Sequence, residues 1–306
     1  MNEVRMMTDV SIEPHIGSRT LSRLLRESVC LLADAGVEQA DNEAAWIVEF
    51  ALGMRRADLY VQRQCQVDSS EWASAMALIR RRAMREPLQY ILGTQEFCGL
   101  DFDVVPDVLI PRPETELLVD EVVRECAAVS SPAIADLGTG SGCIAVALAK
   151  ALPNAHLYAT DVSKAALDLA RRNAARHAVD KQLMFLHGDL FKPIEQLGLN
   201  GQLTAIVSNP PYIADSEFAT LPPEVAQYEP KVALAGGPDG LFLYRRLLRD
   251  AREYLTLGGL LVLEIGYGHA NALRRLAEDL NAYHLVRTLN DQAGIERVLT
   301  LKKTAL

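Results

Sequence analysis

Apolar and polar positions follow two different patterns along this chain. Between residues 20 and 89, apolar residues recur every three or four positions, which is the period of helices that bury one face. Gly36 and Gly53 are placed to end the first two of these helices, because glycine readily adopts the left-handed backbone that closes a helix. We therefore predict an N-terminal helical domain over residues 19–91, preceded by a flexible extension at residues 1–18.

The pattern then changes to short apolar runs that alternate with helical segments. Residues 92–106 alternate around Gly99 and predict a β-hairpin that links two domains. From residue 107 to 306, apolar runs of strand length are followed by helical patterns, which predicts an α/β fold with a doubly wound, mainly parallel sheet. The last two runs, His284–Leu289 and Arg297–Leu301, fit an antiparallel hairpin at the edge of that sheet.

A glycine-rich turn joins the apolar run Ala133–Leu137 to the helical pattern after it. The turn consists of Gly138, Thr139, Gly140, Ser141 and Gly142. Strand, glycine turn and helix together can cradle a nucleotide-like ligand, because glycine lets the backbone approach closely and the helix offers free N–H groups. The spacing matches neither the dinucleotide fingerprint nor a phosphate-binding P-loop. We predict that these five residues bind a cofactor.

Two acidic residues follow the next two apolar runs. Asp161 ends the run that begins at His156, and Asp189 comes just after the run Leu183–His187. At these strand ends, Asp161 is placed to accept hydrogen bonds from ribose hydroxyls, and Asp189 to accept one from an adenine amino group. The alternative role of each, taken alone, is that of a helix cap or turn residue.

The motif Asn209-Pro210-Pro211-Tyr212 follows the apolar run Leu203–Val207. The two prolines stop strand pairing because neither donates a backbone hydrogen bond. They leave an asparagine amide, free carbonyls and an aromatic ring at the carboxyl end of a predicted strand, which is where open α/β sheets bind ligands. An amide beside carbonyl acceptors suits a planar substrate that carries an NH2 group. Taken alone, the motif is equally compatible with a plain proline turn.

Together these features resemble the class I S-adenosylmethionine (SAM) methyltransferases, and the Asn-Pro-Pro-Tyr motif resembles that of members that methylate planar amino groups. Further segments are similar to those of the HemK-type peptide chain release factor glutamine methyltransferases. These segments are Glu86–Gly93, the Ile-Pro-Arg-Pro-Glu-Thr run of Ile110–Thr115, Tyr228–Pro230, Leu263–Gly266 and Glu296–Val298. The resemblance extends over roughly residues 20 to 300, which is nearly the whole chain.

The resemblance implies a seven-stranded, Rossmann-like methyltransferase domain with SAM as its cofactor. It implies methyl transfer to the side-chain amide nitrogen of the glutamine in the Gly-Gly-Gln motif of class 1 peptide chain release factors. The catalytic candidates are Asn209, Pro210 and Tyr212, and the helical domain would dock the protein substrate. Substrate binding would also involve Pro211 and Arg112.

The cofactor would be held by the glycine turn, Asp161, Asp189, Leu190 and Asn209. Some members of the family carry an aromatic residue at the position of Leu190, which leaves open which residue stacks on adenine. In the implied mechanism, the Asn209 side-chain oxygen and the Pro210 carbonyl accept the two amide protons. The nitrogen lone pair then points at the methyl group.

Three other functions share part of this pattern. Glutamine methyltransferases of a ribosomal protein usually read Pro-Arg-Ser-Pro where this chain has Pro111-Arg112-Pro113-Glu114. Adenine-specific DNA methyltransferases share Asn-Pro-Pro-Tyr but need a basic cleft or a target-recognition domain. A non-catalytic module that only binds SAM would have no need of Asn209. These differences favour release factors as the substrate.

The net charge of −9 limits the kinds of partner that the chain can bind. Stable binding to duplex DNA needs a basic surface, and neither residues 1–90 nor the remainder has an excess of basic residues. We therefore expect no stable nucleic-acid binding. One dense basic cluster is either a solvated helix face or a contact for a protein substrate: Arg80, Arg81, Arg82 and Arg85.

The arrangement of the cysteines indicates the cellular compartment of the protein. All five are scattered and none forms a Cys-x-x-Cys pair, which indicates reduced thiols in a cytoplasm. No Cys/His cluster suggests a metal. No apolar run approaches the length of a membrane span, and the first residues lack the apolar core of a signal peptide. We expect a cytoplasmic protein with no metal and no membrane partner.

Overall fold

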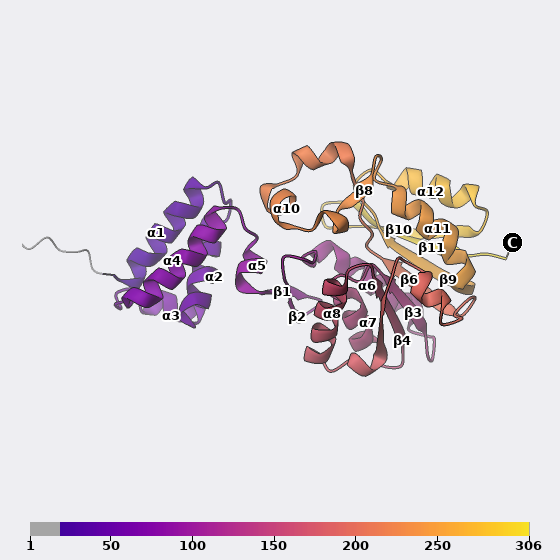
Figure 1. The fold of residues 1–306 in the computed structure, drawn as a ribbon, viewed down its shortest axis with the longest axis horizontal. Helices are drawn as coiled ribbons and strands as arrows, with labels where there is room; N and C mark the ends of the chain where they lie inside the picture. The colour runs from indigo at the N-terminus through magenta and orange to yellow at the C-terminus, as the bar shows by residue number, and fades with distance from the viewer. Residues whose placement is uncertain (1–18, 306) are drawn as a thin grey trace, which may run out of the picture. The chain divides into compact units, whose positions relative to one another are not determined.

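The computed structural model describes residues 19–305 (Figure 1). The extension expected at residues 1–18 lies outside the described residues. The chain forms two compact units, which divide between Leu92 and Gly93. Among the described residues, no helix is both long and apolar enough to cross a membrane.

The N-terminal unit is a bundle of helices. These are α1 (Leu21–Asp34), α2 (Ala40–Leu52), α3 (Arg56–Val61), α4 (Ser69–Ala83) and α5 (Leu88–Leu92). Gly53 closes α2 in the left-handed conformation with φ 62°, as the sequence predicts. Leu24, Val48, Leu59 and Ala75, from four different helices, are buried together in its core.

The basic cluster of this unit is mostly occupied by contacts within the unit. Arg82 is buried and pairs with Glu43 of α2, while Arg81 pairs with Glu86 at 2.6 Å. The Arg85 guanidinium donates to the Gly36 carbonyl oxygen at 2.5 Å. A buried arginine needs such partners because an unpaired charge inside a protein is costly. Arg82 therefore holds α4 against α2, and Arg85 holds the turn after α4 against the end of α1, while Arg80 is exposed.

The C-terminal unit begins with the predicted hairpin, β1 (Thr94–Phe97) and β2 (Leu100–Asp103). Phe97 and Phe102 are fully buried and meet edge to face with ring centroids 6.0 Å apart. Both rings belong to the hydrophobic core of the C-terminal unit. The hairpin is therefore an integral part of this unit.

A seven-stranded sheet in the order β10-β11-β9-β6-β3-β4-β5 forms the centre of the C-terminal unit. Its strands are β3 (Ala133–Leu137), β4 (His156–Asp161), β5 (Leu183–His187), β6 (Leu203–Ser208), β9 (Leu255–Glu264), β10 (Tyr283–Asn290) and β11 (Glu296–Lys303). Strands β5, β4, β3, β6 and β9 are parallel, and β11 runs antiparallel to both β9 and β10. The doubly wound sheet and its antiparallel edge hairpin are thus confirmed.

Helices cover both faces of this sheet (Figure 1). One face carries α6 (Glu116–Cys126), α7 (Cys143–Ala151) and α8 (Lys164–Arg176), with the short 3-10 helices η1 (Pro113–Thr115) and η2 (Asp180–Gln182). The other face carries α9 (Lys192–Glu195), α11 (Phe242–Tyr254) and α12 (Ala270–Asp279). Each face has its own hydrophobic cluster, so the strands are apolar on both sides, as expected for a parallel sheet covered by helices.

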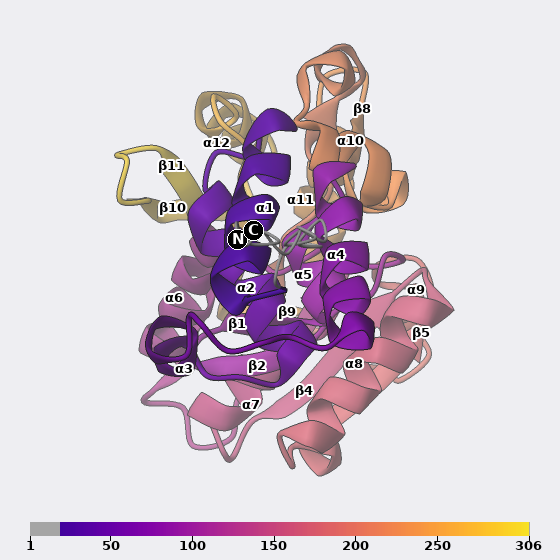
Figure 2. The same cartoon turned by 90° about the vertical axis from the view of Figure 1, so that its left-hand side faces the viewer.

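The segment between β6 and α11 shows no clear periodicity in the sequence but contains five short elements (orange in Figure 2). They are β7 (Ile213–Ala214), η3 (Asp215–Thr220), α10 (Pro223–Tyr228), η4 (Lys231–Ala233) and β8 (Ala235–Gly237). Elements of two to six residues are too short to show a repeating pattern. Pro222 and Pro223 start α10, where a missing N–H costs no hydrogen bond.

Candidate active site

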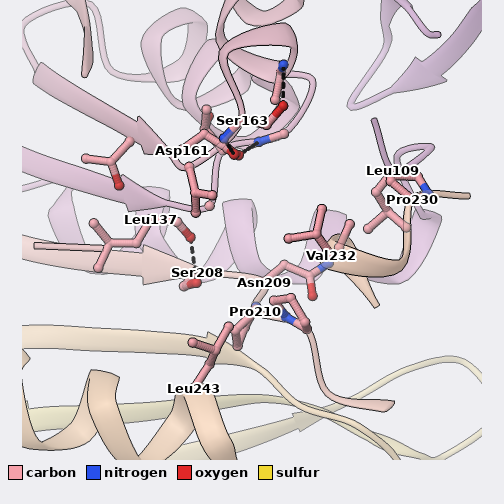
Figure 3. A pocket seen from close by; sticks show the side chains of 18 of the residues that line it. Leu109, Leu137, Asp161, Ser163, Ser208, Asn209, Pro210, Pro230, Val232 and Leu243 are labelled. Atoms are coloured by element: carbon pink, nitrogen blue, oxygen red, sulfur yellow. Dashed lines mark hydrogen bonds between the residues drawn. The ribbon is translucent and has the colours of Figure 1, made fainter. Parts of the chain in front are cut away.

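A cavity of about 390 Å³ lies at the carboxyl ends of β3, β4, β5 and β6 (Figure 3). Its lining includes Gly138, Asp161, Asp189 and Asn209, each of which comes just after one strand or ends it. The structure therefore brings together side chains that are far apart in the sequence. Of the predicted site residues, all line this cavity except Gly142 and Tyr212.

The glycine turn depends on backbone conformations that other residues rarely adopt. Gly138, Gly140 and Gly142 have φ values of 77°, 55° and 81°. A Cβ at Gly142 would lie 2.9 Å from the Ala170 Cβ of α8, so this glycine allows α7 and α8 to approach closely. Gly142 faces α8 in this way and does not line the cavity.

Asp161 fixes the shape of the turn. Its carboxylate accepts hydrogen bonds from the Gly140 N–H at 2.9 Å and from the Ser163 N–H at 2.8 Å. Through Asp161, these two bonds join the turn after β3 to the start of α8; Asp161 and Ser163 are labelled in Figure 3. Burial raises the pKa of Asp161, and the accepted hydrogen bonds oppose that shift. The predicted acceptor for ribose hydroxyls is thus also a support of the turn.

Asp189 is held by an arginine that the sequence did not indicate. The Arg246 Nη2 of α11 donates to Asp189 Oδ2 at 2.7 Å and holds the pKa of this carboxyl below its usual value. Phe242, one turn earlier on α11, also lines the cavity and lies under the Arg246 guanidinium at 5.9 Å. The apolar stripe of α11 indicates core packing, and these two residues lie outside that stripe.

Leu190 follows Asp189 with an unusual backbone. Its φ of 49° lies in the left-handed region, and its side chain is buried and lines the cavity. Gly188, just before the pair, closely approaches Pro193, since a Cβ there would lie 2.9 Å from the proline Cγ. This tight turn directs the end of β5 toward the cavity.

The Asn209 side chain is part of a chain of hydrogen bonds. Its Nδ2 donates to Thr115 Oγ1 at 3.2 Å, and Thr115 Oγ1 donates to Glu264 Oε2 at 2.6 Å. Thr115 and Glu264 are 2% and 3% exposed, so these bonds are shielded from water. Burial raises the pKa of Glu264 to about 7. Beside Asn209, the Ser208 hydroxyl donates to the Leu137 carbonyl at 2.7 Å and ties β6 to β3 (Figure 3).

A second cavity, of about 360 Å³, shares Asn209 and Pro210 with the first. Tyr212 lines this second cavity, with its ring edge-on to His269 at 6.5 Å. Burial raises the pKa of Tyr212 to about 12, so its hydroxyl stays protonated near neutral pH. The Asn-Pro-Pro-Tyr motif therefore lies between two cavities, with Asn209 and Pro210 at their common boundary.

Arg112 lines both cavities and is anchored by an ion pair. Its Nη2 lies 2.5 Å from Glu229 Oε1, and the Glu229 side chain is 1% exposed. Burial raises the pKa of Glu229, and the attraction to Arg112 opposes that shift. The guanidinium thus joins the Ile-Pro-Arg-Pro-Glu-Thr segment to the segment after α10.

The sheet, the glycine turn after β3 and the Asn-Pro-Pro-Tyr motif after β6 define a methyltransferase. The chain matches the family model of the PrmC N-terminal domain over residues 23–93 and that of the methyltransferase small domain over residues 113–223. It is 45% identical over 280 residues to a release factor glutamine methyltransferase of Geobacter sulfurreducens, covering 92% of this chain and 95% of that one. The chain belongs to the family of release factor glutamine methyltransferases.

Two further relatives show the extent of the likeness. A release factor glutamine methyltransferase of Moorella thermoacetica is 42% identical over 91% of this chain and 96% of its own length. A solved structure of a release factor-specific protein-(glutamine-N5) methyltransferase from Alicyclobacillus acidocaldarius is 30% identical, with a TM-score of 0.40. It covers 67% of this chain and 100% of that one.

Proposed function

We propose that this protein transfers a methyl group from SAM to the glutamine of the Gly-Gly-Gln motif in class 1 release factors. One observation carries the proposal: Asn209 and Pro210 line both cavities. The first contains the glycine turn and the strand-end carboxylates, and the second contains Tyr212. A donor in one cavity and an acceptor amide in the other would meet at Asn209.

The first cavity fits the chemical groups of SAM. The glycine turn lets a ligand approach the backbone closely, and the Asp161 carboxylate at the end of β4 can accept from ribose hydroxyls. Asp189 and Leu190 offer a carboxylate for an amino group and an apolar side chain for an adenine ring. When bound, SAM supplies an electrophilic methyl group.

The reaction also requires that the amide of the substrate glutamine be held in the right orientation. An amide nitrogen is a poor nucleophile because it shares its lone pair with the carbonyl group. The Asn209 Nδ2 is already bound to Thr115, which leaves Oδ1 as the end of this amide that can accept from a substrate N–H. Oδ1 and the Pro210 carbonyl would each accept a hydrogen bond from one N–H of the substrate amide. The lone pair of the amide nitrogen then points at the methyl group, an orientation effect worth several kcal/mol.

The protons need no strong base in this scheme. The amide N–H becomes acidic once the methyl group is attached, so its proton can be released to solvent water. Before that, the two acceptor oxygens stabilise the positive charge that develops on nitrogen. Tyr212 and Arg112 line the cavity on the substrate side, and we propose that they contact the glutamine and the chain around it.

The substrate is tested by incubating the protein with labelled SAM and, separately, a release factor, a ribosomal protein and DNA. The family of the chain supports the release factor, and the net charge of −9 disfavours DNA. Label in the release factor glutamine supports the proposal. Label in the ribosomal protein or in DNA alone contradicts it.

We further propose that the helical unit over residues 19–91 docks the release factor. Deletion of residues 1–92 should then raise the KM for a whole release factor far more than the Kd for SAM or the KM for a short Gly-Gly-Gln peptide. An equal KM for the whole factor would contradict docking. We place the reaction in the cytoplasm, where all five cysteines, which are free in the structure, would remain reduced.

A further inference from the structure

The hydrogen bonds from Asn209 to Thr115 and from Thr115 to Glu264 have a direction that matters for the reaction. A threonine hydroxyl has one hydrogen to donate and lone pairs that accept. Because Thr115 donates its hydrogen to Glu264, it can only accept from Asn209. The nitrogen end of the Asn209 amide therefore faces Thr115, and the oxygen end is the one left for a ligand.

The opposite arrangement would disable the site. If Glu264 were protonated, it could donate to Thr115, and the hydroxyl of Thr115 could then donate to Asn209. The Asn209 amide would turn its oxygen to Thr115 and present its NH2 group to the substrate. The NH2 groups of Asn209 and of the substrate glutamine are both donors, so they cannot hydrogen-bond to each other. The substrate amide would then lose its orientation.

Several titratable or charged groups surround Glu264. Arg112, Glu114, Tyr212, Tyr244 and Arg297 interact with it electrostatically, and His269 lines the same cavity. Burial lowers the pKa of His269. The arginines stay charged, and burial raises the pKa of both tyrosines above 10. Tyr244 donates its hydroxyl to the backbone oxygen of Glu264 at 2.8 Å, which fixes the end of β9. Burial itself raises the pKa of Glu264 to about 7.

We propose that Thr115 and Glu264 are positioning residues that hold the Asn209 amide with its oxygen toward the substrate, and that the ionised Glu264 carboxylate sets this polarity. The proposal rests on the proposed function, because it assigns Asn209 Oδ1 the role of accepting from the substrate amide. It adds two buried residues, Thr115 and Glu264, that act on the substrate amide through Asn209.

The first test compares two substitutions at Thr115. Thr115→Val removes the hydroxyl at nearly constant size and should lower kcat for release factor methylation about tenfold or more, with little change in the Kd for SAM. Thr115→Ser keeps the hydroxyl and should recover most of the lost kcat. A merely structural role would not predict rescue by serine.

The matched control for this substitution lies in a different element, strand β11. Thr300 of β11 is also fully buried and also donates to a buried glutamate, Glu121, at 2.8 Å. Thr300→Val makes the same chemical change away from Asn209, so kcat should stay close to that of the wild type. A Thr115→Val variant within twofold of wild type, or one no slower than Thr300→Val, would overturn the proposal.

The second test uses pH. The kcat of the wild type should rise as pH increases through about 7, because the ionised form of Glu264 is the active one. Glu264→Gln cannot ionise and should lose this rise. Asp136 is a second buried carboxyl whose pKa is raised to about 7, so the wild-type profile can also contain a contribution from Asp136. The contribution of Glu264 is therefore the part of the wild-type pH profile that is missing in Glu264→Gln. An identical pH profile in Glu264→Gln would overturn the role of the carboxylate.

The same assay distinguishes failure of the proposed function from failure of the positioning role. If the wild type leaves the release factor glutamine unmethylated, the proposed function fails. If the wild type methylates it while the Thr115 and Glu264 variants show its kcat and pH profile, the proposed function stands and the positioning role fails.

Discussion

The carboxylate of Asp161 accepts a hydrogen bond of 2.9 Å from the backbone N–H of Gly140. This bond joins the end of β4 to the glycine turn after β3, so one side chain both shapes the turn and lines the cavity. Loss of the carboxylate should therefore affect the cofactor in two ways, through lost contacts and through a less ordered turn.

We expect Asp161→Ala to weaken SAM binding by at least about tenfold, because it removes an acceptor and the support of the Gly140 backbone. Isothermal titration calorimetry with SAM measures the effect directly. Asp168→Ala on α8 is a suitable control, because Asp168 is an exposed residue whose ion pair with Arg171 lies on the helix surface. A Kd equal to that of the wild type would remove Asp161 from the cofactor site.

Asn209→Ala should lower methyl transfer about 100-fold or more while SAM still binds. The reason is that the substrate amide loses the acceptor that orients it, and loss of one such hydrogen bond at a reacting centre typically costs this much. Mass spectrometry of the release factor measures turnover, and calorimetry measures SAM binding. Undiminished methylation by this variant would contradict the mechanism.

Gly142→Ala should destabilise the C-terminal unit by about 2–4 kcal/mol. The added Cβ would lie 2.9 Å from Ala170, and the φ of 81° is unfavourable for alanine. Gly294→Ala isolates the second effect, because Gly294 has a φ of 79° but no heavy atom within 4 Å of the added Cβ. Thermal unfolding should show the larger loss for Gly142→Ala. Equal losses would show that α7 and α8 tolerate the extra methyl group.

The buried carboxyl of Glu264 should make stability depend on pH. Its pKa in the folded protein is raised to about 7 from an ordinary value of 4.5, so the folded state binds more protons than the unfolded state between these values. Stability therefore falls as pH rises from about 4.5 to about 7. Glu264→Gln should lack this loss, so its stability relative to the wild type should increase from pH 4 to pH 8 by on the order of 3 kcal/mol.

Urea unfolding of both proteins at pH 4 and pH 8 checks this expectation. The difference in unfolding free energy between Glu264→Gln and the wild type should be larger at pH 8. If that difference is the same at both pH values, the pKa of Glu264 is close to that of an ordinary carboxyl. The glutamate would then be ionised across the range in which the enzyme works.

Much of the fold and part of the site could be predicted from sequence, for one geometric reason. Parallel strands end at the same edge of a sheet, so residues just after successive strands must come together. Asp161, Asp189 and Asn209 were predicted on this basis, and they line one cavity. The sheet, its antiparallel edge hairpin and the family were confirmed by the structure and by the relatives of the chain.

The remaining features depend on contacts between distant segments. Thr115 and Glu264 meet across 149 positions of sequence, and Arg246 reaches Asp189 from a helix whose apolar stripe indicates only core packing. Neither pairing has a local signature, because a salt bridge or hydrogen bond between elements leaves no periodic pattern. The roles of the individual site residues stay predictions until variants are measured.

The most direct test of the account is to incubate the full chain with methyl-labelled SAM and a class 1 release factor, then locate the label by tandem mass spectrometry. The account predicts one methyl group on the side-chain nitrogen of the Gly-Gly-Gln glutamine, formed about 100-fold or more slowly when the Asn209→Ala variant is used. Label at any other residue, or no label with an enzyme that binds SAM, would contradict it.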